Sequence, residues 1–204
     1  MLNFIVIGMI LGMSAGFSPG PLFVLLVSES LQNGMKSGIK IALAPLITDL
    51  PIIFLTLFLS AKLSGLHSVL GVISIIGGLF VMYLGVQRLL TKGVELRLGA
   101  EANSLTKGIT VNALSPHPYL FWFGVGAPLL AKAMTQDIFV ALSFLGSFYV
   151  LLLGSMVLLA LLIGRFRSFL NNSIYIYTMR FLGLVLCILA IVLFRDGLSL
   201  IKRV

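Results

Sequence analysis

Two prolines and two glycines interrupt the first apolar run of the chain. The run extends from about Leu2 to Val27 and contains the segment Gly16-Phe17-Ser18-Pro19-Gly20-Pro21. Proline removes an amide donor and glycine loosens the backbone, so this segment predicts the end of a helix. Freed backbone groups at membrane depth are tolerated only against protein or a polar cavity. We therefore expect a broken membrane helix whose break faces inward.

A similar segment, Ser115-Pro116-His117-Pro118, lies inside a later apolar run. Two proline-broken segments at corresponding places in two halves of a chain are typical of the binding site of a transporter. This recurrence predicts that both breaks contribute to one site.

Composition indicates a polytopic membrane protein. Hydrophobic residues make up 59% of the chain and charged residues 10%, whereas about a quarter of a soluble domain is charged. The 14 Lys and Arg exceed the 6 Asp and Glu, and we attribute this excess to cytoplasmic loops rather than to nucleic-acid binding. The single cysteine, Cys187, excludes an internal disulfide or a dithiol relay.

The apolar runs predict six transmembrane helices in a single domain, 1–204. The longest connection, Thr91–Lys107, separates repeat one (1–90) from repeat two (108–204). Because each repeat has an odd number of spans, the fold class that we expect is all-α with two inverted three-helix repeats, and helices 1 and 4 broken at the proline motifs. The expected spans are Leu2–Val27, Gly38–Ser60, Leu66–Leu90, Gly108–Ala131, Ile138–Gly164 and Met179–Ile201.

The distribution of cations predicts the orientation. Connections one, three and five carry nine Lys and Arg, among them Arg88 and Lys107, and the opposite face carries five. Because cytoplasmic loops are enriched in cations, we expect a multi-pass protein of the cell (plasma) membrane with both termini outside. The first connection, Ser28–Ser37, contains Glu29 and is interpreted as an ordinary polar loop.

Small residues at helical spacing mark expected helix contacts, because they let backbones approach closely in lipid. We expect these contacts within one chain, with a homodimer face as the alternative. They are Gly71, Ser74, Gly78 and Gly85 in the third span and Gly146, Ser147, Gly154 and Ser155 in the fifth.

Asp49 lies in the middle of the second span, next to Thr48 and between Pro45 and Pro51. An ionised carboxylate at bilayer depth costs about 3 kcal/mol on insertion scales, so it should face a cavity, a hydrogen-bonding partner or a cation. Asp49 is thus a candidate proton carrier or counter-charge for a substrate amine. The alternative is a structural carboxylic acid that caps the backbone loosened by the two prolines.

The first break offers freed carbonyls for an ammonium group and a new helix N-terminus for a carboxylate. An amino acid carries both charges, although a plain structural kink is the alternative. At the second break, Asn112 and Ser115 can hydrogen-bond freed backbone or a ligand.

His117 is either a hydrogen-bonded structural group or a group that handles protons or substrate. Tyr119 and Trp122 follow the break, and we interpret them as packing against the pore lining or anchoring at the membrane boundary. No set of ligands at fixed spacing predicts a metal or another cofactor.

The chain resembles the LysE family of exporters, also called the RhtB family, over its whole length. Ser18-Pro19-Gly20-Pro21 resembles the family's Pro-Gly-Pro signature. The spacing from Gly38 to Asp49 resembles its second-span pattern, with Ala44 and Thr48 at two positions where the family has glycine.

In the second half, Asn112, Ser115-Pro116-His117 and Phe121 resemble the family's Asn, Asn-Pro-Lys and Phe. Ser115 replaces asparagine there, and His117 replaces lysine.

The resemblance implies a transporter, not an enzyme, that exports amino acids or related small metabolites and is driven by the proton gradient. A metal-cation exporter is one alternative, and an intramembrane enzyme acting on lipid-linked substrates is another. The expected partners are a small-molecule substrate and membrane lipid. The candidate substrate- or proton-binding residues are Ser18, Pro19, Gly20, Pro21, Thr48, Asp49, Asn112, Ser115, Pro116, His117 and Pro118.

Overall fold

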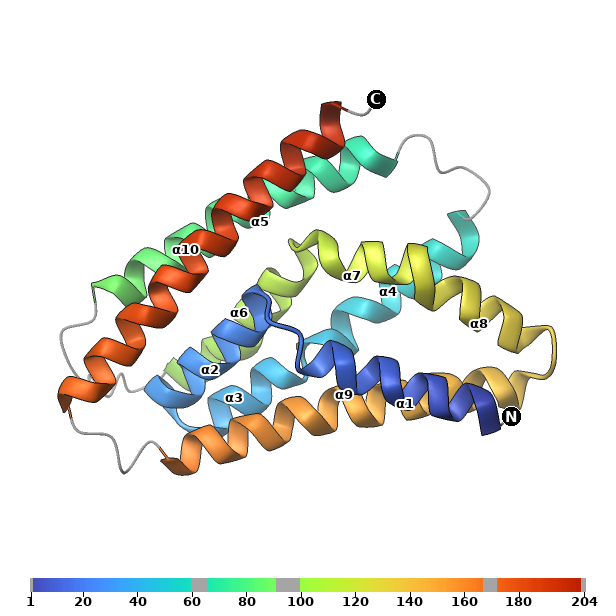
Figure 1. Ribbon diagram of the computed structural model, residues 1–204, viewed down its shortest axis with the longest axis horizontal. Helices are drawn as coiled ribbons and strands as arrows, with labels where there is room; N and C mark the ends of the chain where they lie inside the picture. Colours follow the sequence, from blue (N-terminus) through green and yellow to red (C-terminus); the bar gives the residue numbers. More distant parts are fainter. Residues whose placement is uncertain (1, 60–65, 91–99, 167–171, 203–204) are drawn as a thin grey trace.

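The computed structural model describes residues 2–59, 66–90, 100–166 and 172–202, and its regular elements in these ranges are all helical. The helices are arranged as Figure 1 shows. Their bounds are α1 (Leu2–Gly16), α2 (Pro21–Asn33), α3 (Met35–Ala42), α4 (Ala44–Leu59), α5 (Leu66–Leu89), α6 (Ala100–Ala113), α7 (Pro116–Phe121), the π-helical turn η2 (Trp122–Gly126), α8 (Ala127–Met134), α9 (Ile138–Phe166) and α10 (Asn172–Lys202).

Three helical segments in the described ranges are long and apolar enough to cross a membrane. They are Met35–Leu57, which joins α3 and α4, Ile138–Arg165 in α9, and Ile176–Ser199 in α10. The pair α1 and α2, bent by 62°, is a fourth if it counts as one span. Three to four candidate spans are therefore established, whereas the six-span inverted repeat stays a prediction.

Both expected breaks are present. The first apolar run is divided between α1 and α2, and the second broken run is divided among α6, α7, η2 and α8. Figure 1 shows that α2 and α6 extend from the breaks toward one end of the molecule, and that α1 and α8 extend toward the other end.

Two predicted connections are wrong in part. Ala100–Lys107 belong to α6 rather than to the loop expected at Thr91–Lys107, whose remainder lies outside the described residues. Ser28–Asn33 complete α2 instead of forming a loop. The turn to α3 is made at Gly34, whose positive φ of 88° is a conformation that glycine adopts without a steric penalty.

Small residues join α5 to α10, as predicted for the third span. Ser74 Oγ donates a hydrogen bond of 2.7 Å to the carbonyl oxygen of Leu193. Gly78 faces the backbone of α10, because a Cβ there would lie 3.2 Å from the carbonyl oxygen of Ala190. These contacts are within one chain.

The prediction for the fifth span is correct for its serines and wrong for its glycines. Ser147 and Ser155 of α9 face the buried Gly8 and Gly16 of α1. In contrast, a Cβ at Gly146 or Gly154 would meet nothing within 4 Å. These two glycines face away from the bundle, so the closely packed helix face on α9 is the serine face.

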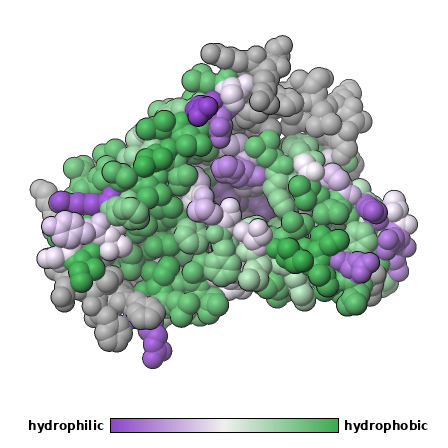
Figure 2. All heavy atoms as spheres, in the orientation of Figure 1, coloured by the Kyte–Doolittle hydropathy of each residue, from purple (hydrophilic) through white to green (hydrophobic). Residues whose placement is uncertain are grey.

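The outer surface is predominantly apolar. Phe54, Phe139, Val150 and Phe181 each expose 65% or more of their surface, and Figure 2 shows apolar residues over most of the visible face. Contiguous apolar surface of this extent is rare on soluble proteins and is expected where a protein contacts lipid. Hydrophilic residues gather in a hollow near the centre of the same face (Figure 2).

Candidate functional site

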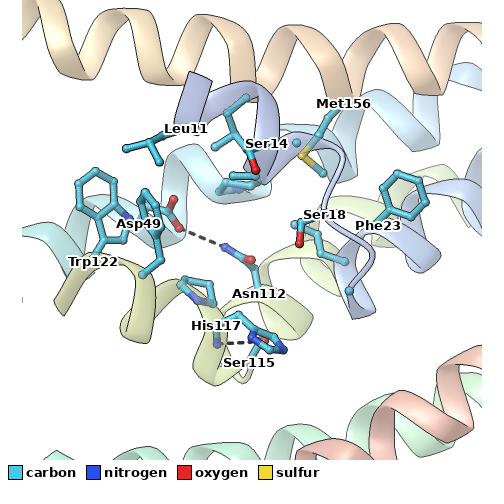
Figure 3. A pocket seen from close by; sticks show the side chains of 18 of the residues that line it. Leu11, Ser14, Ser18, Phe23, Asp49, Asn112, Ser115, His117, Trp122 and Met156 are labelled. Carbon is cyan, nitrogen blue, oxygen red and sulfur yellow. Dashed lines mark hydrogen bonds between the residues drawn. The ribbon is translucent and has the colours of Figure 1, made fainter. Parts of the chain in front are cut away.

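A cavity of about 460 Å³ lies between the two breaks, and Figure 3 shows the side chains around it. Residues from both broken runs line it, together with Asp49 from α4 and apolar side chains from α9. The lining consists of Leu11, Ser14, Ala15, Gly16, Ser18, Pro19, Gly20, Pro21, Leu22, Phe23, Pro45, Asp49, Asn112, Ser115, His117, Pro118, Phe121, Trp122, Val125, Phe148, Leu152 and Met156.

At the first break the chain leaves one helix and starts another at the cavity wall. The last hydrogen bond of α1 runs from the Ser18 N–H to the Ala15 carbonyl at 3.2 Å. Gly20 is extended and precedes Pro21, the first residue of α2, without a side-chain cap. The uncapped N-terminus of α2 therefore opens on the cavity, and helix N-termini attract anions.

The second break is bridged by side chains. Ser115 precedes α7, and its Oγ accepts a hydrogen bond of 3.4 Å from the His117 N–H. The Tyr119 hydroxyl donates to the carbonyl of Ala113 at 2.9 Å, which satisfies a carbonyl at the end of α6. The second break is thus a turn between two half-helices that side-chain hydrogen bonds hold in place.

Asp49 is 5% exposed. Its Oδ1 accepts a hydrogen bond of 3.2 Å from the Asn112 side-chain amide. The same amide donates to Thr48 Oγ1 at 2.6 Å, and that oxygen lies 3.4 Å from Asp49 Oδ1. Amide and hydroxyl groups are neutral partners, so in the described residues Asp49 has no ion-pair partner.

Trp122 is fully buried on the first turn of η2 and lines the same cavity. Its indole lies beside Asp49 in Figure 3. A wider π-helical turn is frequent at functional sites. Sequence analysis did not predict this turn.

The structure brings most of the predicted site residues to the cavity. Thr48 and Pro116 do not line it. Thr48 Oγ1 instead accepts a hydrogen bond from Asn112 and donates one to Asp49, and Pro116 is buried at the start of α7. His117 lines the cavity but is exposed, and no hydrogen bond joins it to Asp49 in the described part of the chain. The role of each residue stays a prediction.

The structure contains a second buried polar group, around Glu29, that the sequence pattern did not predict. Glu29 is completely buried in α2, and its two carboxylate oxygens accept four hydrogen bonds. We call this group the Glu29 cluster. Arg88 of α5 and Lys107 of α6 (2.8 Å) donate to Oε1, whereas Asn33 of α2 (2.6 Å) and Ser104 of α6 (3.2 Å) donate to Oε2.

The position of Glu29 contradicts the interpretation of Ser28–Ser37 as a polar loop, and Arg88 and Lys107 face inward rather than serving as loop cations. Burying an unpaired charge costs several kcal/mol, so these groups must pair. The available signal was the apolar sequence Leu25-Leu26-Val27 just before Glu29, with Leu31 after it, which places Glu29 on a mostly apolar helix.

The donor set of the described residues does not favour a metal. No group of three or more His, Cys, Asp or Glu side chains in these ranges is arranged to hold an ion. Asp49 instead has oxygen and amide neighbours, which suit a proton or an organic cation.

The model of the LysE type translocator family matches residues 13–197. The chain belongs to this family. Members of the LysE family are transporters rather than enzymes, so the chain is a multi-pass membrane protein that exports a small molecule. Comparisons with curated proteins and with solved structures found no match.

Proposed function

We propose that the chain is a secondary transporter that exports amino acids or related small metabolites across the plasma membrane and is driven by the proton gradient. The observation that carries this proposal is a buried carboxyl group, Asp49, in a cavity between two broken helices. A carboxyl without a cationic partner can take up a proton or a substrate ammonium group as access to the cavity alternates.

The cavity lining supports a zwitterionic substrate with an apolar side chain. Asp49 is placed to receive the ammonium group, and the uncapped N-terminus of α2 is placed to receive the carboxylate. Phe148, Leu152 and Met156 of α9 supply an apolar wall for the side chain. A volume of about 460 Å³ lies in the range of small-molecule sites.

We further propose the six-span inverted repeat, with both termini outside, as the architecture that alternates access. The helix after the first break, α2, and the helix before the second break, α6, extend toward the same end of the molecule, and α1 and α8 extend toward the other end (Figure 1). The chain therefore passes the two breaks in opposite directions, which supports the inverted repeat. The cation-rich connections support the orientation, although Arg88 and Lys107 are used internally by Glu29.

The test is leucine flux into proteoliposomes with an imposed pH gradient, comparing the unaltered protein with Asp49→Asn. We expect pH-driven flux to fall at least about tenfold, the equivalent of about 1.4 kcal/mol. Asp137→Asn, which replaces an exposed carboxylate before α9, is the matched control and should leave flux intact.

Leucine–leucine exchange without a gradient separates the two roles of Asp49. Exchange that survives in Asp49→Asn identifies Asp49 as the proton carrier, and exchange that is lost identifies it as the ammonium-binding group. Unchanged pH-driven flux would remove Asp49 from the mechanism. Cadmium flux measured in the same vesicles tests the metal-cation alternative, which no observation on the described donor set favours.

A further inference from the structure

The Glu29 cluster lies between the cavity and the end of the molecule where α2 meets α3. Along α2, Phe23 lines the cavity and Glu29 follows six residues later, roughly 9 Å along the helix axis. Along α6, Asn112 lines the cavity and Lys107 lies five residues earlier, roughly 7.5 Å away. The two half-helices therefore extend from the cavity toward the same end (Figure 1). Glu29 of α2 joins them there through its bond with Lys107 of α6.

An apolar layer separates the cavity from the cluster. Leu25 and Leu26 of α2 are fully buried, Val24 is 5% exposed, and Val111 of α6 is 1% exposed. This layer and the charged cluster behind it close the cavity at the α2–α3 end. A transporter must open such a closure once in each cycle, so the groups that hold it are part of the transport mechanism.

We propose that the Glu29 cluster is the gate of the cavity at its α2–α3 end, and that it opens when the two α6 residues of the cluster, Lys107 and Ser104, leave Glu29 and α6 separates from α2. The proposal rests on membership of the translocator family and on the cavity as its pathway, not on the identity of the substrate or on proton coupling.

The pairing within the cluster is unequal, which favours a gate over a permanent structural pair. Arg88 is 6% exposed in its side chain and alone neutralises Glu29, whereas the Lys107 side chain is 27% exposed and reaches water. Both cations bind the same oxygen, Oε1. Lys107 can therefore leave without stranding a buried charge, because Arg88 stays on Glu29.

The helices that carry the two cations are held differently, in keeping with the unequal pairing. Arg88 belongs to α5, which packs along α10 through Ser74, Gly78 and Gly85. Lys107 belongs to α6, which ends at the second break. Glu29 is therefore fixed to a long helix pair on one side and to a short half-helix on the other, so the α6 contact is the one that opens.

The test measures access to the cavity and needs no substrate. In a Cys187→Ser background, which removes the single cysteine, Ser18→Cys reports on the cavity. A membrane-impermeant maleimide is added to one side of sealed vesicles at a time. Two reference cysteines show which end of the molecule faces each side of the vesicle. They are Lys36→Cys, at an exposed position in α3, and Gln136→Cys, at an exposed position between α8 and α9, and these segments lie at opposite ends (Figure 1).

We expect Lys107→Met to raise the labelling rate of Ser18→Cys at least fivefold from the side that labels Lys36→Cys, with no increase from the other side. Lys107→Arg should restore slow labelling. Lys132→Met, which removes an exposed lysine at the other end, should have no effect. Glu29→Gln should act in the same direction as Lys107→Met if it folds.

Unchanged labelling in Lys107→Met would overturn the gate. An equal increase from both sides would also overturn it, because that result indicates a loosened bundle rather than one opened end. Since the labelling requires neither substrate nor a proton gradient, a failure here is independent of the outcome for Asp49→Asn.

Discussion

The side-chain amide of Asn112 donates to Asp49 Oδ1 at 3.2 Å, although the two residues are 63 positions apart and lie on α6 and α4. The same amide donates to Thr48 Oγ1 at 2.6 Å. One amide therefore holds the acid of the first half of the chain to the half-helix that ends at the second break.

Thr48→Val and Asn112→Leu should have effects on stability that do not add. Thr48→Val keeps the shape of the side chain but removes the oxygen that Asn112 bonds, and Asn112→Leu removes the donor. Groups in one network couple by about 0.5–3 kcal/mol. A double-mutant cycle of thermal unfolding in detergent measures this coupling, and strict additivity would show that the bond has no energetic role.

Pro19→Ala and Pro116→Ala should reduce leucine flux more than they reduce the amount of protein in the membrane. Pro19 lies between α1 and α2, and Pro116 is the first residue of α7 after the end of α6. Replacing either proline restores an amide donor and allows a helix to continue through the break. Pro128→Ala, at an exposed position in α8 outside the cavity lining, is the control. Parallel losses of flux and protein would favour a purely structural kink.

Gly12→Ala should destabilise the bundle by about 1–3 kcal/mol, the usual cost of overpacking. A Cβ at Gly12 would lie within 2.9 Å of the backbone carbonyl carbon of Phe148, and backbone cannot move aside cheaply. Gly154→Ala, on the open face of α9, should be neutral or stabilising by up to about 1 kcal/mol. Unfolding midpoints measure both, and equal destabilisation would contradict the α1–α9 packing.

Met156→Trp should lower flux at least about tenfold by filling the cavity from the α9 wall. Leu158→Trp, two residues further along α9 and 52% exposed on the outer face, is the matched control. The two variants carry the same added ring, so a difference between them reflects the cavity. Retained transport in Met156→Trp would place the pathway elsewhere.

The breaks and the buried acid were predictable because they depend on residue type. Proline is disfavoured inside a helix because it lacks an amide donor and clashes with the preceding turn, so Pro19, Pro21 and Pro116 marked the breaks. A mid-span carboxyl such as Asp49 must find a polar environment. The contact face of α5 was equally readable, because Ser74 and Gly78 are one helical turn apart and both meet α10.

The rest depends on tertiary pairing, which local sequence does not specify. Glu29 is buried because Arg88 and Lys107 reach it from positions 59 and 78 residues away. The polar residues that surround it in the sequence are otherwise typical of a loop. The π-helical turn at Trp122 has no local signature either, and the open face of Gly154 depends on which helix packs on α9.

The segment between α1 and α2 has a mechanical consequence. Around this break, the N–H groups of Phe17 and Ser18 donate to carbonyls within α1, and the N–H of Val24 donates to the carbonyl of Gly20, on the α2 side of the break. In the described stretch 2–59, none of these bonds crosses Pro19. Rotation about the backbone torsions of a few residues near Pro19 can therefore change the angle between α1 and α2 without breaking a hydrogen bond of either helix. The Glu29 cluster meanwhile holds the far part of α2 in place.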